Sequence, residues 1–143
     1  MAAPVVVPGA SVILKRLLPS AEEPDAGKAL ALLDALEAET LRCLLPGLWF
    51  YEVGITIARR FPANANAWLM ALQKLALDEA PRTPRWLDAA LALTERHGVT
   101  FHDAACHATA LVHGGMFITA DERYVERAGA AGGVVSLGDW TPA

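Results

Sequence analysis

Short apolar runs alternate with longer helix-like segments along this sequence, and this alternation restricts its fold more than any other feature. The strand-like runs are VVV at 5–7, LRCLL at 41–45, a weaker run at 75–77, MFIT at 116–119 and GVVSL at 133–137. The clearest helix is expected at 83–98, where Thr83 and Pro84 suit a helix start and Gly98 suits its end. The alternation predicts βαβ crossovers, and therefore a mainly parallel central sheet with helices on both faces.

We expect one compact domain over residues 1–143, because the chain has no repeat, linker or low-complexity tract. No apolar run approaches the ~20 residues that a membrane span needs. The N-terminal stretch MAAPVVVPGAS lacks the basic region of a signal peptide. Cys43 and Cys106 are the only cysteines, which predicts no disulfide scaffold and a cytoplasmic location.

Acidic side chains stand at junctions where parallel sheets bind ligands. Asp121 follows the strand-like MFIT by two positions, and Asp103 opens a helix-like segment of small residues. Ligands of open parallel sheets bind beyond the carboxyl ends of the strands, so we expect these two carboxylates to meet there, near Gly9. Glu52 is the only carboxylate of an apolar helix expected over 48–60, where a buried charge needs a partner or a metal. Three converging carboxylates favour a site for Mg²⁺ or Mn²⁺, ions that serve phosphodiester hydrolysis.

Each of these acids also has a purely structural interpretation. Asp103 and Asp121 can act as helix N-caps, a role worth about 1 kcal/mol that requires no active site. Glu52 can be partly exposed. Ser11 can orient a water molecule or ligand, but its role as the N-cap of the first helix is favoured on physical grounds.

Other chemistries have less support in the sequence. His102 and Cys106 stand four positions apart, with His107 next to Cys106. Structural zinc usually has four ligands in paired spacings, so a buried cysteine and ordinary helix histidines are favoured. No serine lies in a G-x-S-x-G elbow, and no phosphate-binding glycine motif indicates a nucleotide cofactor.

The net charge of −4 gives no overall attraction to RNA, but local basic clusters are candidate phosphate contacts. These are Lys15, Arg16, Arg59 and Arg60.

Four motifs resemble those of the PIN-domain family, and within it the ribonuclease toxins of bacterial toxin–antitoxin pairs, in order and spacing. They are ASVILK at 10–15, PGLWFYEVGITIARR at 46–60, GVTFHDAACHATAL at 98–111 and MFITADERY at 116–124. The resemblance implies a three-layer α/β/α fold and places three of the family's acids at Glu52, Asp103 and Asp121. It also implies Mg²⁺ or Mn²⁺ bound by these acids, cleavage of RNA, homodimers, and an antitoxin that covers the active site.

The sequence departs from the family's pattern at several positions, among them the two aromatic positions flanking the start of the Asp103 helix, which are His102 and Cys106 here. The family's first acid belongs at the end of the first strand, where this chain has Gly9, and its helper asparagine is replaced by Ile55. Loss of a group that holds a metal typically costs 10–100-fold in affinity or activity. Two interpretations follow: a metal-dependent endoribonuclease of toxin type impaired by Gly9, or a catalytically inactive PIN-like module that dimerises and binds an antitoxin or RNA. In both, Gly9 is either natural or a substitution that silences a toxic protein.

Overall fold

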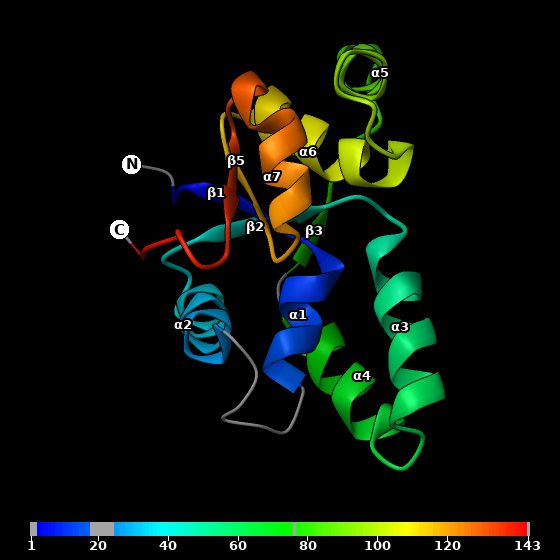
Figure 1. Cartoon of the computed structure of the whole chain (residues 1–143). Coiled ribbons are helices and arrows are strands. Elements are labelled where there is room, and N and C mark those ends of the chain that lie inside the picture. Colours follow the sequence, from blue (N-terminus) through cyan, green and yellow to red (C-terminus); the bar gives the residue numbers. More distant parts are fainter. Residues whose placement is uncertain (1–2, 18–24, 76, 143) are drawn as a thin grey trace.

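A computed structural model describes residues 3–17, 25–75 and 77–142 of the chain. Within these residues, five parallel strands form one sheet in the order β3-β2-β1-β4-β5, seen at the centre of Figure 1. The strands are β1 (Val5–Pro8), β2 (Arg42–Leu45), β3 (Leu77–Glu79), β4 (Met116–Thr119) and β5 (Val134–Ser136). The expected strands are confirmed, although the third lies slightly later than the run at 75–77 that suggested it.

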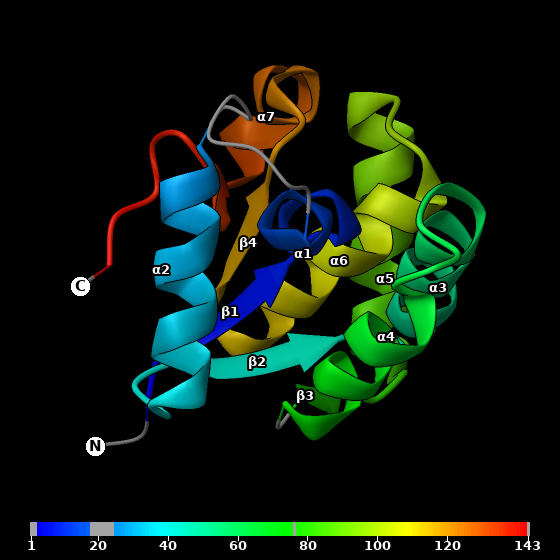
Figure 2. The ribbon, with the colours of Figure 1, turned by 90° about the horizontal axis from the view of Figure 1, so that it is seen from below.

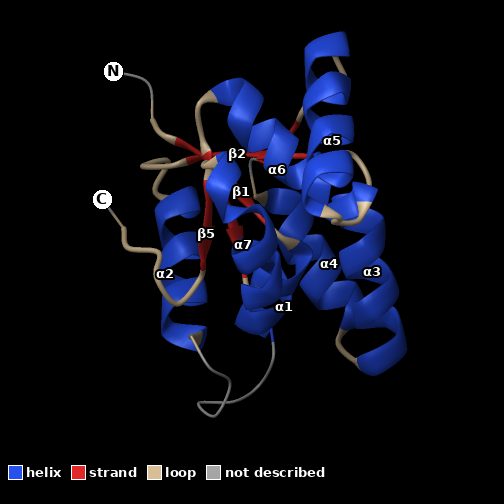
Figure 3. Cartoon of the chain, turned by 45° about the horizontal axis from the view of Figure 1, so that its top comes forward, coloured by secondary structure: helices blue, strands red, loops and turns tan. Residues whose placement is uncertain are grey.

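Helices cover both faces of this sheet, which confirms the expected three-layer α/β/α architecture. The helices are α1 (Ala10–Leu17), α2 (Ala26–Glu37), α3 (Trp49–Arg60), α4 (Ala65–Lys74), α5 (Pro84–His97), α6 (Phe101–His113) and α7 (Glu122–Ala128), followed by the short 3₁₀ helix η1 (Gly129–Ala131). Figures 1 and 2 show α1 to α4 on one side of the sheet and α5 and α6 on the other. Figure 3 shows the strands enclosed between these two helical layers.

Helix α6 lies against β1 and β4 and is itself covered by α5. Its central residues are small, and Ala104, Ala108 and Ala110 are fully buried, which lets the sheet and α5 approach it closely. Gly114, with φ of 64°, ends the helix in the left-handed region that favours glycine. Thr100 begins it, because its hydroxyl accepts a hydrogen bond from the Asp103 N–H at 3.2 Å. The expectation that Asp103 is the N-cap is therefore wrong; Asp103 lies in the first turn.

The chain order of the strands creates a switch point between β1 and β4. From β1 the chain runs outward to β2 and β3, and then returns to β4 on the other side of β1. Gly9 ties the two strands together at their carboxyl ends, since its N–H donates to the Ile118 carbonyl at 2.9 Å. Open parallel sheets bind ligands at such a point. No helix in the described ranges is long and apolar enough to cross a membrane.

Candidate active site

The three acids singled out in the sequence line one cavity of about 250 Å³ at the carboxyl edge of β1 and β4. We call it the carboxylate cavity. Glu52 reaches it from α3, Asp103 from the first turn of α6, and Asp121 from the junction between β4 and α7. Gly9 and Ser11 line it as well. The structure thus brings together, at the switch point of the sheet, residues that are far apart in the sequence.

Asp121 serves as the N-cap of α7, as its structural interpretation predicted. Its Oδ1 accepts hydrogen bonds from the N–H groups of Arg123 at 3.0 Å and Tyr124 at 3.3 Å. Its own N–H donates to the Thr119 hydroxyl at 3.0 Å. Both capping bonds end on Oδ1, so Oδ2 remains available to a ligand in the cavity. Capping and ligand binding are therefore compatible at this residue.

Asp103 is held by the residue that caps its helix. The Thr100 hydroxyl accepts from the Asp103 N–H and donates to the Asp103 Oδ2, both at 3.2 Å. A carboxylate in the first turn also interacts favourably with the positive end of the helix dipole. Asp103 is thus oriented toward the cavity by its own helix start.

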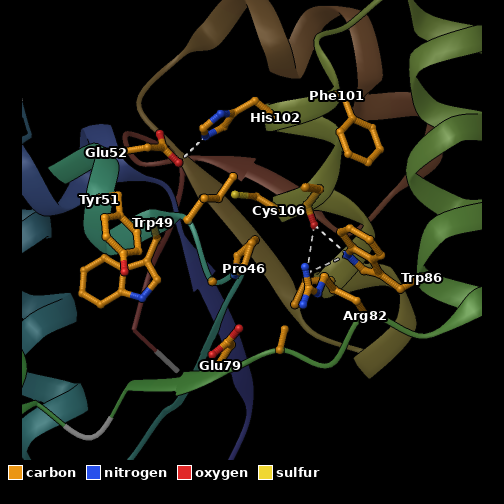
Figure 4. A pocket seen from close by; sticks show the side chains of 15 residues that line it. Pro46, Trp49, Tyr51, Glu52, Glu79, Arg82, Trp86, Phe101, His102 and Cys106 are labelled. Atoms are coloured by element: carbon orange, nitrogen blue, oxygen red, sulfur yellow. Dashed lines mark hydrogen bonds and ion pairs between the residues drawn. The ribbon is translucent and has the colours of Figure 1, made fainter. Parts of the chain in front are cut away.

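Glu52 has a partner that the sequence analysis did not identify. The His102 Nε2 forms an ion pair or hydrogen bond with its Oε1 across the space between α3 and α6 (Figure 4). Partial burial raises the pKa of Glu52, His102 opposes this rise, and the charge of Asp103 adds to it. The only sequence signal for this contact was the position of His102, directly before Asp103 in the motif.

Cys106 lines the same cavity as a neutral thiol. Burial raises its pKa to about 12, and the charges of Glu52 and Asp103 contribute to the rise. The zinc alternative involving His102 and Cys106 gains no support from the geometry, since no three His, Cys, Asp or Glu side chains of the described residues are placed to hold a metal ion.

Gly9 occupies a position that can accept a side chain. A Cβ placed there would lie 3.4 Å from the Phe117 Cε1, 3.5 Å from the Ile118 carbonyl oxygen and 3.8 Å from the Ser11 Oγ, which is ordinary packing. Its backbone is not among those with positive φ, so the fold does not demand glycine. The Gly9 carbonyl accepts from the Val12 and Ile13 N–H groups and so begins α1. Ser11 consequently lies inside α1, and its expected role as the N-cap is wrong.

Lys15, Arg59 and Arg60, which were considered as phosphate contacts, are not among the described residues that line the carboxylate cavity. Arg59 and Arg60 lie at the far end of α3, about 12 Å along the helix from Glu52 at 1.5 Å per residue. The Arg60 guanidinium packs 5.4 Å from the centre of the Phe61 ring. Lys15 is half-buried on α1, and the side chain of Arg16 lies outside the described residues. Their contact with RNA stays a prediction.

A larger cavity of about 540 Å³ adjoins the carboxylate cavity. Its aromatic lining residues, after which we call it the aromatic groove, are Trp49, Tyr51, Trp86 and Phe101. The residues common to both cavities are Trp49, Glu52, His102 and Cys106. This groove could not be found in the sequence, because its walls come from three separate parts of the chain: α3, α6 and the segment before α5.

The chemistry of the donors fits a hard divalent cation, because carboxylate oxygens are the ligands that Mg²⁺ and Mn²⁺ prefer. Among the described residues, however, no three His, Cys, Asp or Glu side chains form a ready-made metal site. In this arrangement Glu52 is engaged with His102. Binding of an ion by all three carboxylates therefore uses the Glu52 Oε2 or requires Oε1 to leave His102.

Comparisons with known proteins identify the family of the chain and solved structures with a similar fold. The family model described as "PIN domain" matches residues 6–130. The FitAcB crystal structure from Neisseria gonorrhoeae superposes with a TM-score of 0.68 at 17% identity, covering 94% of this chain and 99% of that one. A toxin–antitoxin complex from Klebsiella pneumoniae gives 0.65 at 18% identity, covering 92% and 97%. VapBC2 from Rickettsia felis, bound to a DNA fragment from its promoter, gives 0.65 at 12% identity, covering 92% and 96%. Among curated proteins, none matches the chain by sequence.

Proposed function

Because the chain belongs to the PIN-domain family, whose members are generally divalent-metal-dependent nucleases, we propose that the carboxylate cavity is the active site of a ribonuclease of the toxin type. The observation that carries the proposal is the convergence of Glu52, Asp103 and Asp121 on one cavity at the switch point of the sheet. The substrate is an RNA phosphodiester bond. The acids come from three separate elements, so helix capping alone does not explain their convergence.

In this proposal Glu52, Asp103 and Asp121 hold Mg²⁺ or Mn²⁺. Such an ion neutralises charge on the phosphate and lowers the pKa of a water molecule. Asp121 and Asp103 are pre-oriented by their bonds to the starts of α7 and α6, while Glu52 binds the ion through Oε2 or through an Oε1 that has left His102. The Ser11 hydroxyl, on the cavity wall, positions a water molecule or the substrate. Because Gly9 supplies no oxygen, the ion is bound more weakly than a fourth carboxylate would allow.

The proposed setting is a cytoplasmic homodimer paired with a cognate antitoxin. The pairing with an antitoxin is supported by the similar solved structures, one of which is titled a toxin–antitoxin complex and another VapBC2. An antitoxin that covers the carboxylate cavity would block access of RNA to the acids.

The test is cleavage of a mixed RNA substrate by the purified protein in Mn²⁺, beside an Asp103→Asn variant. Asparagine keeps the size of the side chain and its bond with Thr100 but removes the charge that holds the ion. We expect the native chain to cleave and the variant to lose at least about 100-fold in rate, with an unchanged melting temperature. Equal cleavage by both proteins would show that the activity arises elsewhere.

A second function is favoured by Gly9 and by the Glu52–His102 pair: a catalytically inactive module that dimerises and binds an antitoxin or RNA. Both features reduce the number of oxygens ready for an ion. Absence of cleavage by the native chain, together with cleavage by Gly9→Asp, would establish this alternative. Since a Cβ fits at Gly9 without strain, failure of the variant cannot be attributed to backbone conformation.

A further inference from the structure

We propose that the aromatic groove binds the base of a nucleotide next to the bond that is cut, with preference for guanine or cytosine. This inference rests on the proposed function, because it places the RNA phosphate in the carboxylate cavity. It adds a recognition site for the base and assigns side chains that select it.

The groove has the size and lining of a site for a flat aromatic group. Its volume of about 540 Å³ lies within the range of small-molecule sites. Figure 4 shows Trp49 and Tyr51 on one side and Phe101 and Trp86 on the other. Tyr51 is 68% exposed and Phe101 46%, so each of these residues has surface that a ligand can contact. Bases stack on such rings whatever their sequence.

Hydrogen bonds and ring packing hold the wall that carries Trp86 and Phe101. The Trp86 indole N–H donates to the Ala105 carbonyl at 3.1 Å and to the Thr109 hydroxyl at 3.2 Å. The rings of Trp86 and Phe101 pack edge to face, with centroids 6.1 Å apart. Preorganised rings lose little conformational freedom when a base binds, which favours binding.

The groove is continuous with the carboxylate cavity. Glu52 and His102, on α3 and α6, line both spaces. A strand whose phosphate lies among the acids therefore has its neighbouring base at the mouth of the groove. This continuity is the reason for assigning the groove to the RNA strand rather than to an unrelated ligand.

Two charged side chains lie at the end of the groove away from Glu52, as Figure 4 shows: Arg82 and Glu79. The Glu79 carboxylate lies directly against Gly47, where a Cβ would be 2.5 Å from its Oε1. A carboxylate accepts from an amino group and a guanidinium donates to a carbonyl. Guanine and cytosine carry both groups, whereas adenine lacks the carbonyl and uracil lacks the amino group. This pairing gives the expected base preference.

The test of the groove measures binding without cleavage. Fluorescently labelled single-stranded RNA is titrated with the full chain in the presence of Ca²⁺ in place of Mn²⁺, and anisotropy gives the dissociation constant. Tyr51→Ala and Phe101→Ala are expected to weaken binding about tenfold each. Leu91→Ala, which truncates a 50% exposed side chain of α5 outside the groove, is the matched control and should bind like the native chain. Tyr51→Ala and Leu91→Ala should keep the native melting temperature, because these residues are at least half exposed. Phe101→Ala should melt a few degrees lower, because it loses the edge-to-face contact with Trp86.

The test of base selection uses RNAs that differ at a single position. Glu79→Gln is expected to remove the discrimination against uracil and to leave the affinity for uracil-containing RNA within about twofold. Arg82→Gln is expected to remove the discrimination against adenine and to leave the affinity for adenine-containing RNA within about twofold. Equal affinity of the native chain for all four bases would overturn the proposed selection.

The outcomes separate this inference from the proposed function. If Asp103→Asn abolishes cleavage but Tyr51→Ala and Phe101→Ala bind RNA like the native chain, the groove proposal is wrong and the nuclease stands. If RNA binding depends on both rings, but neither the native chain nor Gly9→Asp cleaves in Mn²⁺, the groove stands and the nuclease is wrong. If the native chain does not bind RNA, the groove proposal is wrong, and a protein partner becomes the alternative occupant of the groove.

Discussion

Helix α6 carries two histidines five positions apart, His102 and His107, whose surroundings differ sharply. His107 is fully buried. Its Nε2 lies 2.6 Å from the Gly132 carbonyl and must donate to it, because a carbonyl only accepts. Its Nδ1 then accepts from the Tyr124 hydroxyl at 2.7 Å. His102 has a side chain that is 46% exposed and touches Glu52 across the boundary between two elements.

The comparison distinguishes buried polar groups, whose hydrogen bonds support the fold, from partly exposed polar groups, which are available to bind a ligand. Both ring nitrogens of His107 have fixed partners, and among the described residues no buried side-chain nitrogen or oxygen lacks one. His102 and Glu52 are partly open to solvent and lie at the junction of the two cavities. Their contact can be exchanged for a ligand without disturbing the core. The same helix thus anchors the sheet through its middle and serves the cavity through its first turn.

The strongest test of this contrast removes the buried ring. His107→Ala leaves the Tyr124 hydroxyl and the Gly132 carbonyl without partners and opens a cavity beside Phe117. We expect a loss of about 3 kcal/mol or more in the free energy of unfolding, measured by urea denaturation. A loss below about 1 kcal/mol would contradict the structural role assigned to this residue.

The pH dependence of stability tests the same residue. Burial lowers the pKa of His107 below its ordinary value of 6.5, although the Gly132 carbonyl opposes this. Below pH 6.5 the unfolded chain therefore binds more protons at this position than the folded chain, so stability is present above pH 6.5 and is lost as the pH falls through the lowered folded value. Urea unfolding between pH 7.5 and 5 should show a flatter slope in His107→Gln than in the native chain. His113→Gln, which changes a histidine at the end of α6, is the control and should keep the native slope.

Asp121 combines both roles, so substitutions should separate them. Asp121→Ala removes the α7 cap and is expected to cost about 1 kcal/mol in unfolding free energy. Asp121→Asn keeps an oxygen acceptor for the cap and should cost only a few tenths. Both variants should lose Mn²⁺ binding, measured by calorimetry. Native Mn²⁺ affinity in Asp121→Asn would show that this carboxylate is structural alone.

A small effect on stability is also expected for His102→Ala. The contact with Glu52 is partly exposed, and such pairs contribute between about 0 and 1 kcal/mol. Thermal denaturation should therefore place the variant within a few degrees of the native chain. A loss as large as that of His107→Ala would show that the pair holds α3 against α6, and the contrast between the two histidines would disappear.

Much of this arrangement could be predicted from the sequence. The alternation of apolar runs and helical segments predicted the parallel three-layer fold. Asp121 after MFI and Gly9 after VVV placed the site at the carboxyl edge, because the ends of neighbouring parallel strands must meet there.

The remaining features depend on which of several nearby groups caps a helix and on contacts between elements that are distant in the sequence. Thr100, not Asp103, is the N-cap of α6. The T-x-x-D spacing could have indicated this. The Gly9 carbonyl rather than the Ser11 side chain begins α1. The Glu52–His102 contact and the aromatic groove could not be predicted, since both depend on how α3 is set against α6, which neither segment encodes alone.

The most direct test of the central claim, that the cavity beside Gly9 holds a divalent ion, is the Mn²⁺ dissociation constant of Gly9→Asp measured by calorimetry. The control is Gly27→Asp, which adds the same charge in α2 at a position where a Cβ meets nothing within 4 Å. We predict that Gly9→Asp tightens Mn²⁺ binding by about 10- to 100-fold relative to the native chain, while Gly27→Asp leaves it unchanged. Unchanged affinity in Gly9→Asp, or an equal gain in both variants, would contradict the metal site.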